Sequence, residues 1–230
     1  MTVELVKHSA ADTDVLWAAR VSTAGEQSLD EINKDPERSK GLINYLMRDR
    51  HGSPFEHNSM TFFVTAPLFV FREFHRHRVG WSYNEESGRY RELEPVFYVP
   101  DAERKLVQRG RPGKYEFVQG TPEQLEIVER TMSDAYERSY AAYQEMLASG
   151  VAREVARATL PVGLYSSMYA TCNARSLMHF LGLRTQHELA KVPSFPQREI
   201  EMVAELMEAE WARLMPLTHA AFNANGRVAP

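Results

Sequence analysis

One short segment of the chain gathers an unusual density of basic side chains. Residues 74–93 read FHRHRVGWSYNEESGRYREL and contain Arg76, Arg78, Arg89 and Arg91, with His75 and His77. The chain as a whole is nevertheless slightly acidic, with a formal net charge of −4. Like charges repel, so a fold normally spreads them over its solvated faces unless an anion collects them. The segment therefore indicates either an anion-binding site or a coincidence of surface charges.

The residues between the arginines favour the binding site. The stretch SYNEESGRY places hydroxyls, an amide and carboxylates around Arg89, with aromatic side chains on either side. A pocket for a phosphate and a heteroaromatic ring needs forked guanidinium donors, short hydroxyl or backbone donors and flat apolar walls. This segment supplies all three, so it predicts a ligand that carries both a phosphate and a ring.

A purely structural explanation of the basic segment stays open. If residues 68–77 are helical, Arg72 and Arg76 lie one turn apart, and such a like-charge pair costs only about 0.2–0.5 kcal/mol on an exposed helix. Cations at a helix C-terminus also gain from the helix dipole. A fold could therefore keep Arg76, His77 and Arg78 in place without any ligand.

A second polar collection lies in NARSLMHFLGLR, residues 173–184. In a helix, residues eleven apart return to nearly the same face, which aligns Asn173 with Arg184, whereas Arg175 and His179 lie four apart on another face. These lines predict a second part of the site. A surface helix with ordinary solvated charges is the alternative.

Histidines and the single cysteine give little support to a metal site or a covalent nucleophile. His75 and His77 on a helix would point about 200° apart, and no HExxH motif or cysteine pair completes a ligand set near His51 or His57. Cys172 cannot form an internal disulfide, which fits a reducing compartment. No histidine or aspartate stands next to Cys172 in the sequence to activate its thiol. We therefore predict no metal.

Composition places the chain among ordinary globular proteins. It has 230 residues, 43% of them hydrophobic and 25% charged. No apolar run reaches the roughly 18 residues that a membrane-spanning helix needs, and the N-terminus lacks a signal-peptide layout. The acidic balance argues against a protein that mainly binds nucleic acid. We expect a single domain over residues 1–230, in the cytoplasm, with neither a membrane nor a nucleic-acid partner.

The expected elements mix strands and helices without a regular βαβ alternation. Strands are predicted at 2–8, 59–66 and 163–172, helices at 12–22, 38–50, 121–150, 151–161 and 173–184, a short helix from Pro67, and a last amphipathic helix at 198–215. Residues 101–120 show no sustained period and are expected to form a mobile loop. This order predicts an α+β fold, or an irregular α/β fold, with a mixed, mainly antiparallel sheet and flanking long helices.

Five motifs together resemble the flavin-dependent thymidylate synthases. They are AARVS, HGSPFEH, FREFHRHR with NEESGRY, VARATLP and NARSLMHFLGLR, they stand in the family's order, and they cover nearly the whole chain. The resemblance implies conversion of deoxyuridylate (dUMP) to thymidylate (dTMP) with FAD, methylenetetrahydrofolate as the carbon donor and NADPH as the reductant. It also implies a homotetramer whose active sites are shared between subunits.

The resemblance assigns roles by motif match. FAD contacts are expected from Ser53, Arg76, His77, Arg78, Glu85, Asn173, Arg175 and His179, with Ser22 and His51 as weaker candidates. Contacts with dUMP are expected from Glu73, Arg76, Ser87, Gly88, Arg89, Arg157 and Arg184. Arg184 is the expected catalytic residue, because a fixed cation near N3, C4 and O4 stabilises an electron-rich uracil ring. No enzyme cysteine is required, and Ser87, without a general base, is assigned to binding.

Some positions depart from the family's pattern. Eight residues separate the RHR triplet from Ser87 where seven are usual, which predicts a bulge, with Trp81 as its candidate. His179 and Glu73 stand where some relatives have Asn and Gln, and the segment after Arg184 leaves the role of His187 open. Two other hypotheses remain: a nucleic-acid-binding module that uses the RHR cluster and the RGRPGK stretch, and a flavin- or nucleotide-binding protein without synthase activity.

Overall fold

The computed structural model describes residues 1–26, 35–111 and 114–230. The described residues form two compact units, each built from non-contiguous segments. Unit 1 comprises Met1–Thr65, Glu73–Glu85 and Ser167–Pro230, and unit 2 comprises Ala66–Arg72 and Glu86–Ser166. A single domain over 1–230 stays a prediction.

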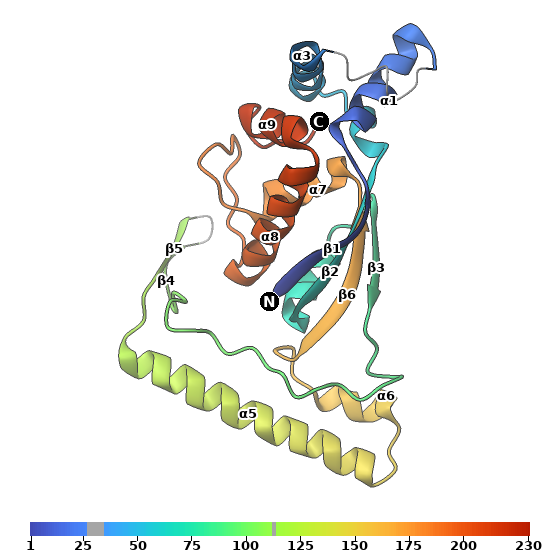
Figure 1. The fold of residues 1–230 in the computed structure, drawn as a ribbon. Helices are drawn as coiled ribbons and strands as arrows, with labels where there is room; N and C mark the ends of the chain where they lie inside the picture. Colours follow the sequence, from blue (N-terminus) through green and yellow to red (C-terminus); the bar gives the residue numbers. More distant parts are fainter. Residues whose placement is uncertain (27–34, 112–113) are drawn as a thin grey trace. The chain divides into compact units, whose positions relative to one another are not determined.

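Unit 1 is built on a four-stranded sheet with the order β1-β2-β6-β3 (Figure 1). The strands are β1 (Thr2–Ser9), β2 (Ser59–Pro67), β3 (Trp81–Glu85) and β6 (Tyr165–Cys172). β1 pairs antiparallel with β2, and β3 pairs antiparallel with β6. Hydroxyl contacts join β2 to β6, between Thr61 and Thr171 at 2.9 Å and between Thr65 and Ser167 at 3.0 Å. The predicted mainly antiparallel sheet and the α+β class are confirmed.

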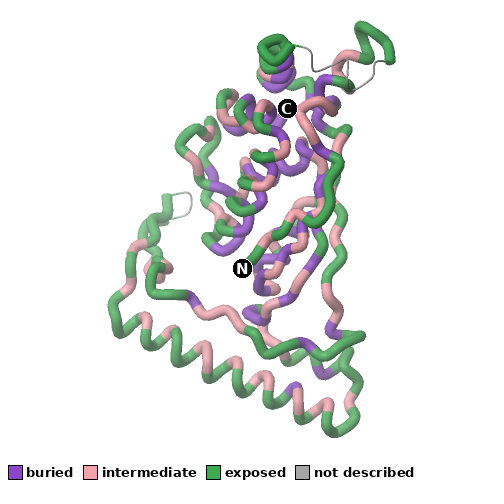
Figure 2. Tube along the Cα trace, in the orientation of Figure 1, coloured by how far each residue is buried: buried purple, intermediate pink, exposed green. Residues whose placement is uncertain are grey.

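The central strand β2 shows why the sheet folds as it does. Its burial alternates, with Met60, Phe62 and Val64 fully buried while the residues between them are partly accessible. Successive side chains of a strand point to opposite faces, so one face of β2 supplies apolar surface to the core. Figure 2 shows this buried surface continuing along the sheet strands and into α7 and α8.

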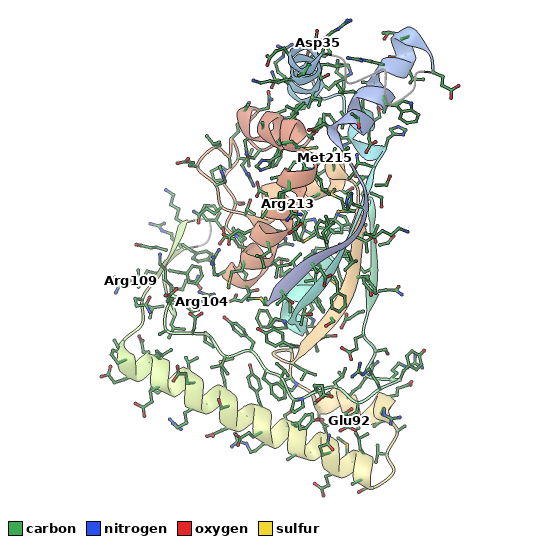
Figure 3. The ribbon with its side chains drawn as sticks, in the orientation of Figure 1. Asp35, Glu92, Arg104, Arg109, Arg213 and Met215 are labelled. Carbon is green, nitrogen blue, oxygen red and sulfur yellow. The ribbon has the colours of Figure 1, made fainter. Side chains whose placement is uncertain are left out.

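Five helices and a 3₁₀ turn accompany the sheet among the described residues of unit 1, and α8 packs directly against a strand. They are α1 (Asp12–Ala24), α3 (Pro36–Arg48), α7 (Ala174–Arg184), α8 (Arg198–Leu214) and α9 (Pro216–Ala224), with the 3₁₀ turn η1 (Ser53–Glu56). α8 packs against β1, α7 and α9, and its Trp211 is fully buried. Asp35 caps α3 by accepting the Arg38 N–H at 3.0 Å, and Figure 3 labels it at the start of that helix.

Unit 2 is organised around one long helix, α5 (Pro122–Ala148). A capping box starts it: the Thr121 hydroxyl accepts the Gln124 N–H at 3.2 Å, and the Gln124 side chain accepts the Thr121 N–H at 2.9 Å. The short elements α6 (Arg153–Ala156) and η2 (Arg157–Thr159) pack on α5. Near its C-terminal end Gln144 donates to Glu92, which is labelled in Figure 3.

The structure corrects the expected loop at 101–120. A hairpin of β4 (Val107–Arg111) and β5 (Lys114–Val118) occupies most of it. Gly110, with φ +92°, lies against the Lys114 carbonyl at a distance that a side chain would not allow. Pro112 and Gly113 of the RGRPGK stretch lie outside the described residues. Each strand spans only five residues and none of them is buried, so no alternation revealed them.

Other boundaries differ in informative ways. The 198–215 helix is not the last one, because Pro216 starts α9 at a position where its missing N–H costs nothing. Pro67 ends β2 instead of opening the next helix, α4 (Leu68–Phe74). The N-cap of α1 is Ala11, whose N–H is accepted by the Asp14 carboxylate at 2.8 Å.

No helix in the described ranges is both long and apolar enough to cross a membrane.

A buried ionic network ties the end of α9 to α8. The Arg227 guanidinium, whose side chain is 1% exposed, donates to Glu208 at 2.6 and 2.7 Å and to the Thr185 hydroxyl at 2.9 Å. His219 contacts the same carboxylate at 2.8 Å. Burial by itself raises the pKa of Glu208, but hydrogen bonds and charge from Arg227 and His219 outweigh it and lower the pKa to about 2.

Candidate functional site

The basic segment leaves α4 in a tight turn. α4 ends at Phe74, so the predicted helix over 68–77 is three residues too long and Arg76 does not lie on it. The Tyr83 hydroxyl of β3 donates to the carbonyls of Phe74 and His77, both at 2.9 Å. The His77 N–H also donates to the Phe74 carbonyl at 2.8 Å. Tyr83 therefore holds the turn against the sheet.

An aromatic cluster lies beside this turn, formed by Phe74, His77, Trp81, Tyr83 and Phe180. Phe74 stacks on Phe180 with ring centroids 4.8 Å apart, and Trp81 stacks on Tyr83 at 5.7 Å. The His77 ring meets Phe180 edge-on at 4.9 Å. Phe74 and Phe180 are fully buried, whereas His77, Trp81 and Tyr83 are partly accessible, so only these three rings of the cluster can face a ligand.

Arg184 joins the cluster from the end of α7. Its Nε–H donates to Nε2 of His77 at 3.0 Å, and its terminal nitrogens bind the Glu73 carboxylate and the Glu73 carbonyl, the latter at 3.3 Å. Only 12% of the Arg184 side chain is exposed. Burial, together with the positive charges of Arg184 and His179, lowers the pKa of His77 to about 4. Three of the predicted site residues thus form one contact chain.

Arg76 and Arg78 differ from the other arginines of the segment. Both are exposed, and within the described part of the chain neither guanidinium has an ion-pair partner. In unit 2, by contrast, Arg89 pairs with Glu154 at 2.7 Å and Arg91 pairs with Glu86 at 3.0 Å. The uncompensated cations on the unit 1 side are therefore available to an anion.

The start of α7 is fastened to the same turn. Asn173 is the N-cap, and its side chain accepts the Ser176 N–H at 2.9 Å. The Ser176 hydroxyl donates to the Val79 carbonyl at 3.0 Å, next to Gly80 with φ +69°. A Cβ on Gly80 would lie 2.1 Å from the Ser176 hydroxyl. Glycine is thus required where the backbone passes over α7.

We expect Gly80→Ala to lower the free energy of unfolding by more than about 1 kcal/mol, because the left-handed backbone and the Ser176 contact both oppose a side chain. Gly41→Ala is the matched control: Gly41 lies inside α3 with no atom within 4 Å of its Cβ position. Removing a helix-interior glycine should stabilise by about 0.5–1 kcal/mol. Urea unfolding measures both, and shifts of the same sign would contradict the assignment.

Other predicted flavin residues lie nearby in unit 1 but contact protein groups. Arg175 donates to the Pro230 carbonyl at 2.7 Å and to Glu56 at 2.5 Å. Its guanidinium also lies against Gly52, where a Cβ would be 2.6 Å away. His179 is exposed overall, but partial burial of its ring, with the charges of Arg175 and Arg50, lowers its pKa. Ser53 opens η1 and Glu85 ends β3, both exposed, whereas Ser22 is an exposed residue of α1.

Unit 2 brings together the other predicted nucleotide residues, which are Ser87, Gly88, Arg89 and Arg157. The chain turns at Ser87, whose carbonyl accepts the N–H groups of Tyr90 at 3.0 Å and of Arg91 at 3.3 Å. Gly88 is buried, and a Cβ there would lie 3.4 Å from Cδ of Arg157. The seven predicted dUMP residues thus form one group in each unit, with Glu73, Arg76 and Arg184 in unit 1.

Comparisons with known proteins decide the family. A family model described as thymidylate synthase complementing protein matches residues 4–217. The flavin-dependent thymidylate synthase of Streptomyces coelicolor is 85% identical over 230 residues, covering 100% of this chain and 94% of the relative. That of Tropheryma whipplei strain TW08/27 is 56% identical, covering 100% and 95%. The chain belongs to the flavin-dependent thymidylate synthase family.

A solved relative supports the fold of this flavin-dependent thymidylate synthase family member. The UMP/dUMP methylase PolB from Streptomyces cacaoi, bound with 5-Br dUMP, matches with a TM-score of 0.93 and 58% identity. The match covers 100% of this chain and 97% of the other. The family resemblance of the motifs is therefore confirmed, whereas the roles of the individual site residues stay predictions.

The extra residue that this chain carries between RHR and Ser87 does not form a bulge at Trp81. β3 pairs with β6 in unbroken register from Trp81↔Cys172 to Glu85↔Met168, so Trp81 is simply the first residue of a strand. A bulge at Trp81 is therefore excluded. Several contact residues were also missed, although Tyr83 lies inside the basic segment, Ser176 lies inside the NARSLMHFLGLR motif and Glu154 stands three positions before Arg157.

The residues present fit the flavin that the family name implies. Exposed cations that have no ion-pair partner among the described residues, partly accessible aromatic rings and a glycine turn belong to unit 1. Within the described ranges, no group of three or more His, Cys, Asp or Glu side chains could hold a metal ion. Cys172 is buried in β6, and burial raises the pKa of its thiol, which keeps it protonated and unreactive.

Proposed function

We propose that this protein converts dUMP to dTMP, with methylenetetrahydrofolate as the carbon donor and FAD reduced by NADPH. The observation that carries the proposal is Arg184, a cation held by His77 and Glu73 beside an aromatic surface. Relatives 85% identical over the full chain are named flavin-dependent thymidylate synthases, and PolB binds 5-Br dUMP, which supports the same substrate here.

Arg184 would stabilise the charge that develops on the uracil ring. Adding hydride to the ring and a carbon unit to C5 moves electron density towards C4 and O4, and a fixed cation lowers the free energy of such states. Glu73 and His77 hold the guanidinium, so it need not reorganise during the reaction. Alignment of the two rings supplies much of the remaining rate enhancement.

The basic residues divide between the two ligands. Arg76 and Arg78, with His77, Ser53, Glu85, Asn173, Arg175 and His179, would hold the flavin; when bound, FAD supplies the hydride. Ser87, Gly88, Arg89 and Arg157 would hold the nucleotide monophosphate. A phosphate near Arg89 would compete with Glu154 for its guanidinium. Each charge-assisted hydrogen bond contributes about 1.5–3 kcal/mol, which offsets the crowding of cations.

The chemistry requires a reductant but no cysteine. A methyl group is more reduced by two electrons than the methylene bridge of the folate donor, so electrons must enter, and NADPH through the flavin supplies them. Cys172 is 3% exposed with a raised pKa, which supports a mechanism without a thiolate nucleophile. A homotetramer with shared active sites and a cytoplasmic location complete the proposal, by resemblance to the family; neither a membrane nor a nucleic acid is a partner in it.

The deciding experiment follows the folate carbon. Purified protein with FAD, NADPH and dUMP is given methylenetetrahydrofolate labelled with ¹³C in the methylene group, and mass spectrometry should find the label in the dTMP methyl group. Oxidation of the reduced flavin is measured with and without dUMP. A colourless protein that takes up no FAD would contradict any flavin function. A bound flavin whose oxidation ignores dUMP would indicate a flavoprotein without synthase activity.

UMP is a specific second substrate to test. PolB, 58% identical over the whole chain, is described as a UMP/dUMP methylase and also binds 5-Br UMP. The same labelling assay with UMP in place of dUMP compares the two values of kcat/KM. Label in the ribonucleotide would extend the proposal to both sugars, and its absence would restrict the proposal to the deoxynucleotide.

A further inference from the structure

In the hydrogen bond between Arg184 and His77, arginine must be the donor and histidine the acceptor. An arginine side chain only donates hydrogen bonds and stays charged throughout the accessible pH range. Its Nε–H points at Nε2 of His77 over 3.0 Å, so Nε2 must carry the lone pair. The imidazole proton then belongs on Nδ1. Glu73 binds the two terminal nitrogens of the same guanidinium.

We propose that His77 is a positioning residue for Arg184, because its Nε2 accepts the Arg184 Nε–H and thereby fixes the plane of the guanidinium before dUMP binds. The inference rests on the proposed function and deepens it. Glu73 alone would leave the guanidinium free to pivot about its terminal nitrogens. The Nε contact adds a third point on the other side of the group, and three points define its plane.

The surroundings of His77 keep it in the accepting form. The charged and titratable groups around it are Arg184 and His179 from α7, Glu73 from α4 and Tyr83 from β3, with Arg76 and Arg78 as its chain neighbours. Cations predominate, so a second proton on the imidazole would face the guanidinium across 3.0 Å. The ring is also half-buried against Phe180. The lowered pKa, about 4, agrees with this arrangement.

The contact also links two predicted ligand sites. His77 is expected at the flavin and Arg184 at the uracil, and within the described residues Nδ1 of His77 has no hydrogen-bond partner. Its N–H is therefore available to a ligand on the side away from Arg184. A ligand that binds the Nδ1–H of His77 would orient the imidazole ring, and the same ring orients the Arg184 guanidinium.

Paired amide variants test the position of the acceptor. Glutamine places its carbonyl oxygen near Nε2, and asparagine places it near Nδ1. His77→Asn should lose about 10²-fold in kcat because misplaced groups cost that much, whereas His77→Gln, which keeps an acceptor near Nε2, should lose clearly less. KM for dUMP and FAD content are measured for both. His8→Asn, an exposed substitution on β1, is the control expected to change nothing.

The tautomer of His77 can be measured by NMR in protein that is not catalysing the reaction. Protein with ¹⁵N-labelled histidine is examined by ¹H–¹⁵N correlation, with and without FAD, and the His77 signals are assigned from their loss in His77→Gln. We expect a proton on Nδ1 and none on Nε2 from pH 5 to 8. A proton on Nε2, or a titration near the ordinary pKa of histidine, would overturn the inference. Equal losses in both amide variants would do the same.

The two failures are distinguishable. If the proposed function is wrong, wild-type protein forms no labelled dTMP, and the tautomer measurement still decides whether His77 accepts from Arg184. If the inference is wrong, wild-type protein is active and His77→Asn retains kcat, or Nε2 carries the proton.

Discussion

Arg184→Ala is expected to lower kcat for dTMP formation by about 10²- to 10³-fold, the loss seen when one fixed donor to a developing negative charge is removed. FAD should remain bound, because the uncompensated cations Arg76 and Arg78 are untouched. The absorbance of the bound flavin and the labelled-methyl assay measure the two effects separately. A low dielectric makes the loss large, since little of this side chain meets water.

Two further arginine variants complete the test. Arg184→Lys keeps the charge but removes the fork that binds His77 and Glu73 together, so it should recover only part of the rate. Arg213→Ala removes an exposed arginine that pairs with Glu210 on α8 and should leave kcat unchanged (Figure 3). If Arg184→Ala loses FAD itself, Arg184 belongs to flavin binding and its catalytic assignment is wrong.

Arg227→Met is expected to lower the free energy of unfolding by about 3–5 kcal/mol, because it removes the buried guanidinium and leaves the largely buried Glu208 carboxylate, 16% exposed, without its main partner. The double variant with Glu208→Gln should recover part of that loss, because it removes the carboxylate charge that has lost its partner. Arg198→Ala is the matched control on α8: its guanidinium lies at the surface, where it pairs with Glu201 and Glu205, and surface pairs contribute about 0.2–1 kcal/mol each. Urea unfolding at pH 7 measures all of them.

The same network predicts a pH dependence with a definite sign. The pKa of Glu208 falls from its ordinary 4.5 to about 2 on folding, so the stabilisation is complete above pH 4.5 and is lost as the pH falls towards 2. Glu208→Gln should flatten the stability curve in that window. The stability change linked to His77 lies between pH 6.5 and about 4, above most of this window, and it is common to the wild-type and Glu208→Gln proteins. Wild-type and Glu208→Gln curves of equal slope would contradict the assignment.

Amphipathic elements were predictable because their burial is periodic. The alternating residues of β2 and the capping box of α5 give patterns that local physics produces whatever the rest of the chain does. The β4–β5 hairpin has no buried residue and therefore no pattern. α4 stops at Phe74 although polar and aromatic residues continue, and the Phe74 carbonyl then accepts the hydroxyl of Tyr83, nine residues later, a contact that no local pattern reveals.

Site residues could be named from sequence, but their partners could not. The arginines, the SGRY turn and the late helix are all visible as motifs. Arg184 and His77, however, are 107 positions apart, and Arg89 and Glu154 are 65 apart. Such pairs depend on strand order: β3 pairs with β6, and β6 leads directly into α7, which brings Arg184 beside the RHR turn.

The length of α7 fixes the distance between Asn173 and Arg184. Its cap at Asn173 and its last residue, Arg184, are eleven residues apart, so they are separated by about 16 Å along the axis. One inserted or deleted residue would turn Arg184 by about 100° and shift it by about 1.5 Å relative to Asn173. Evolution can therefore vary the residue types along this helix, but we expect it to tolerate no change in their number.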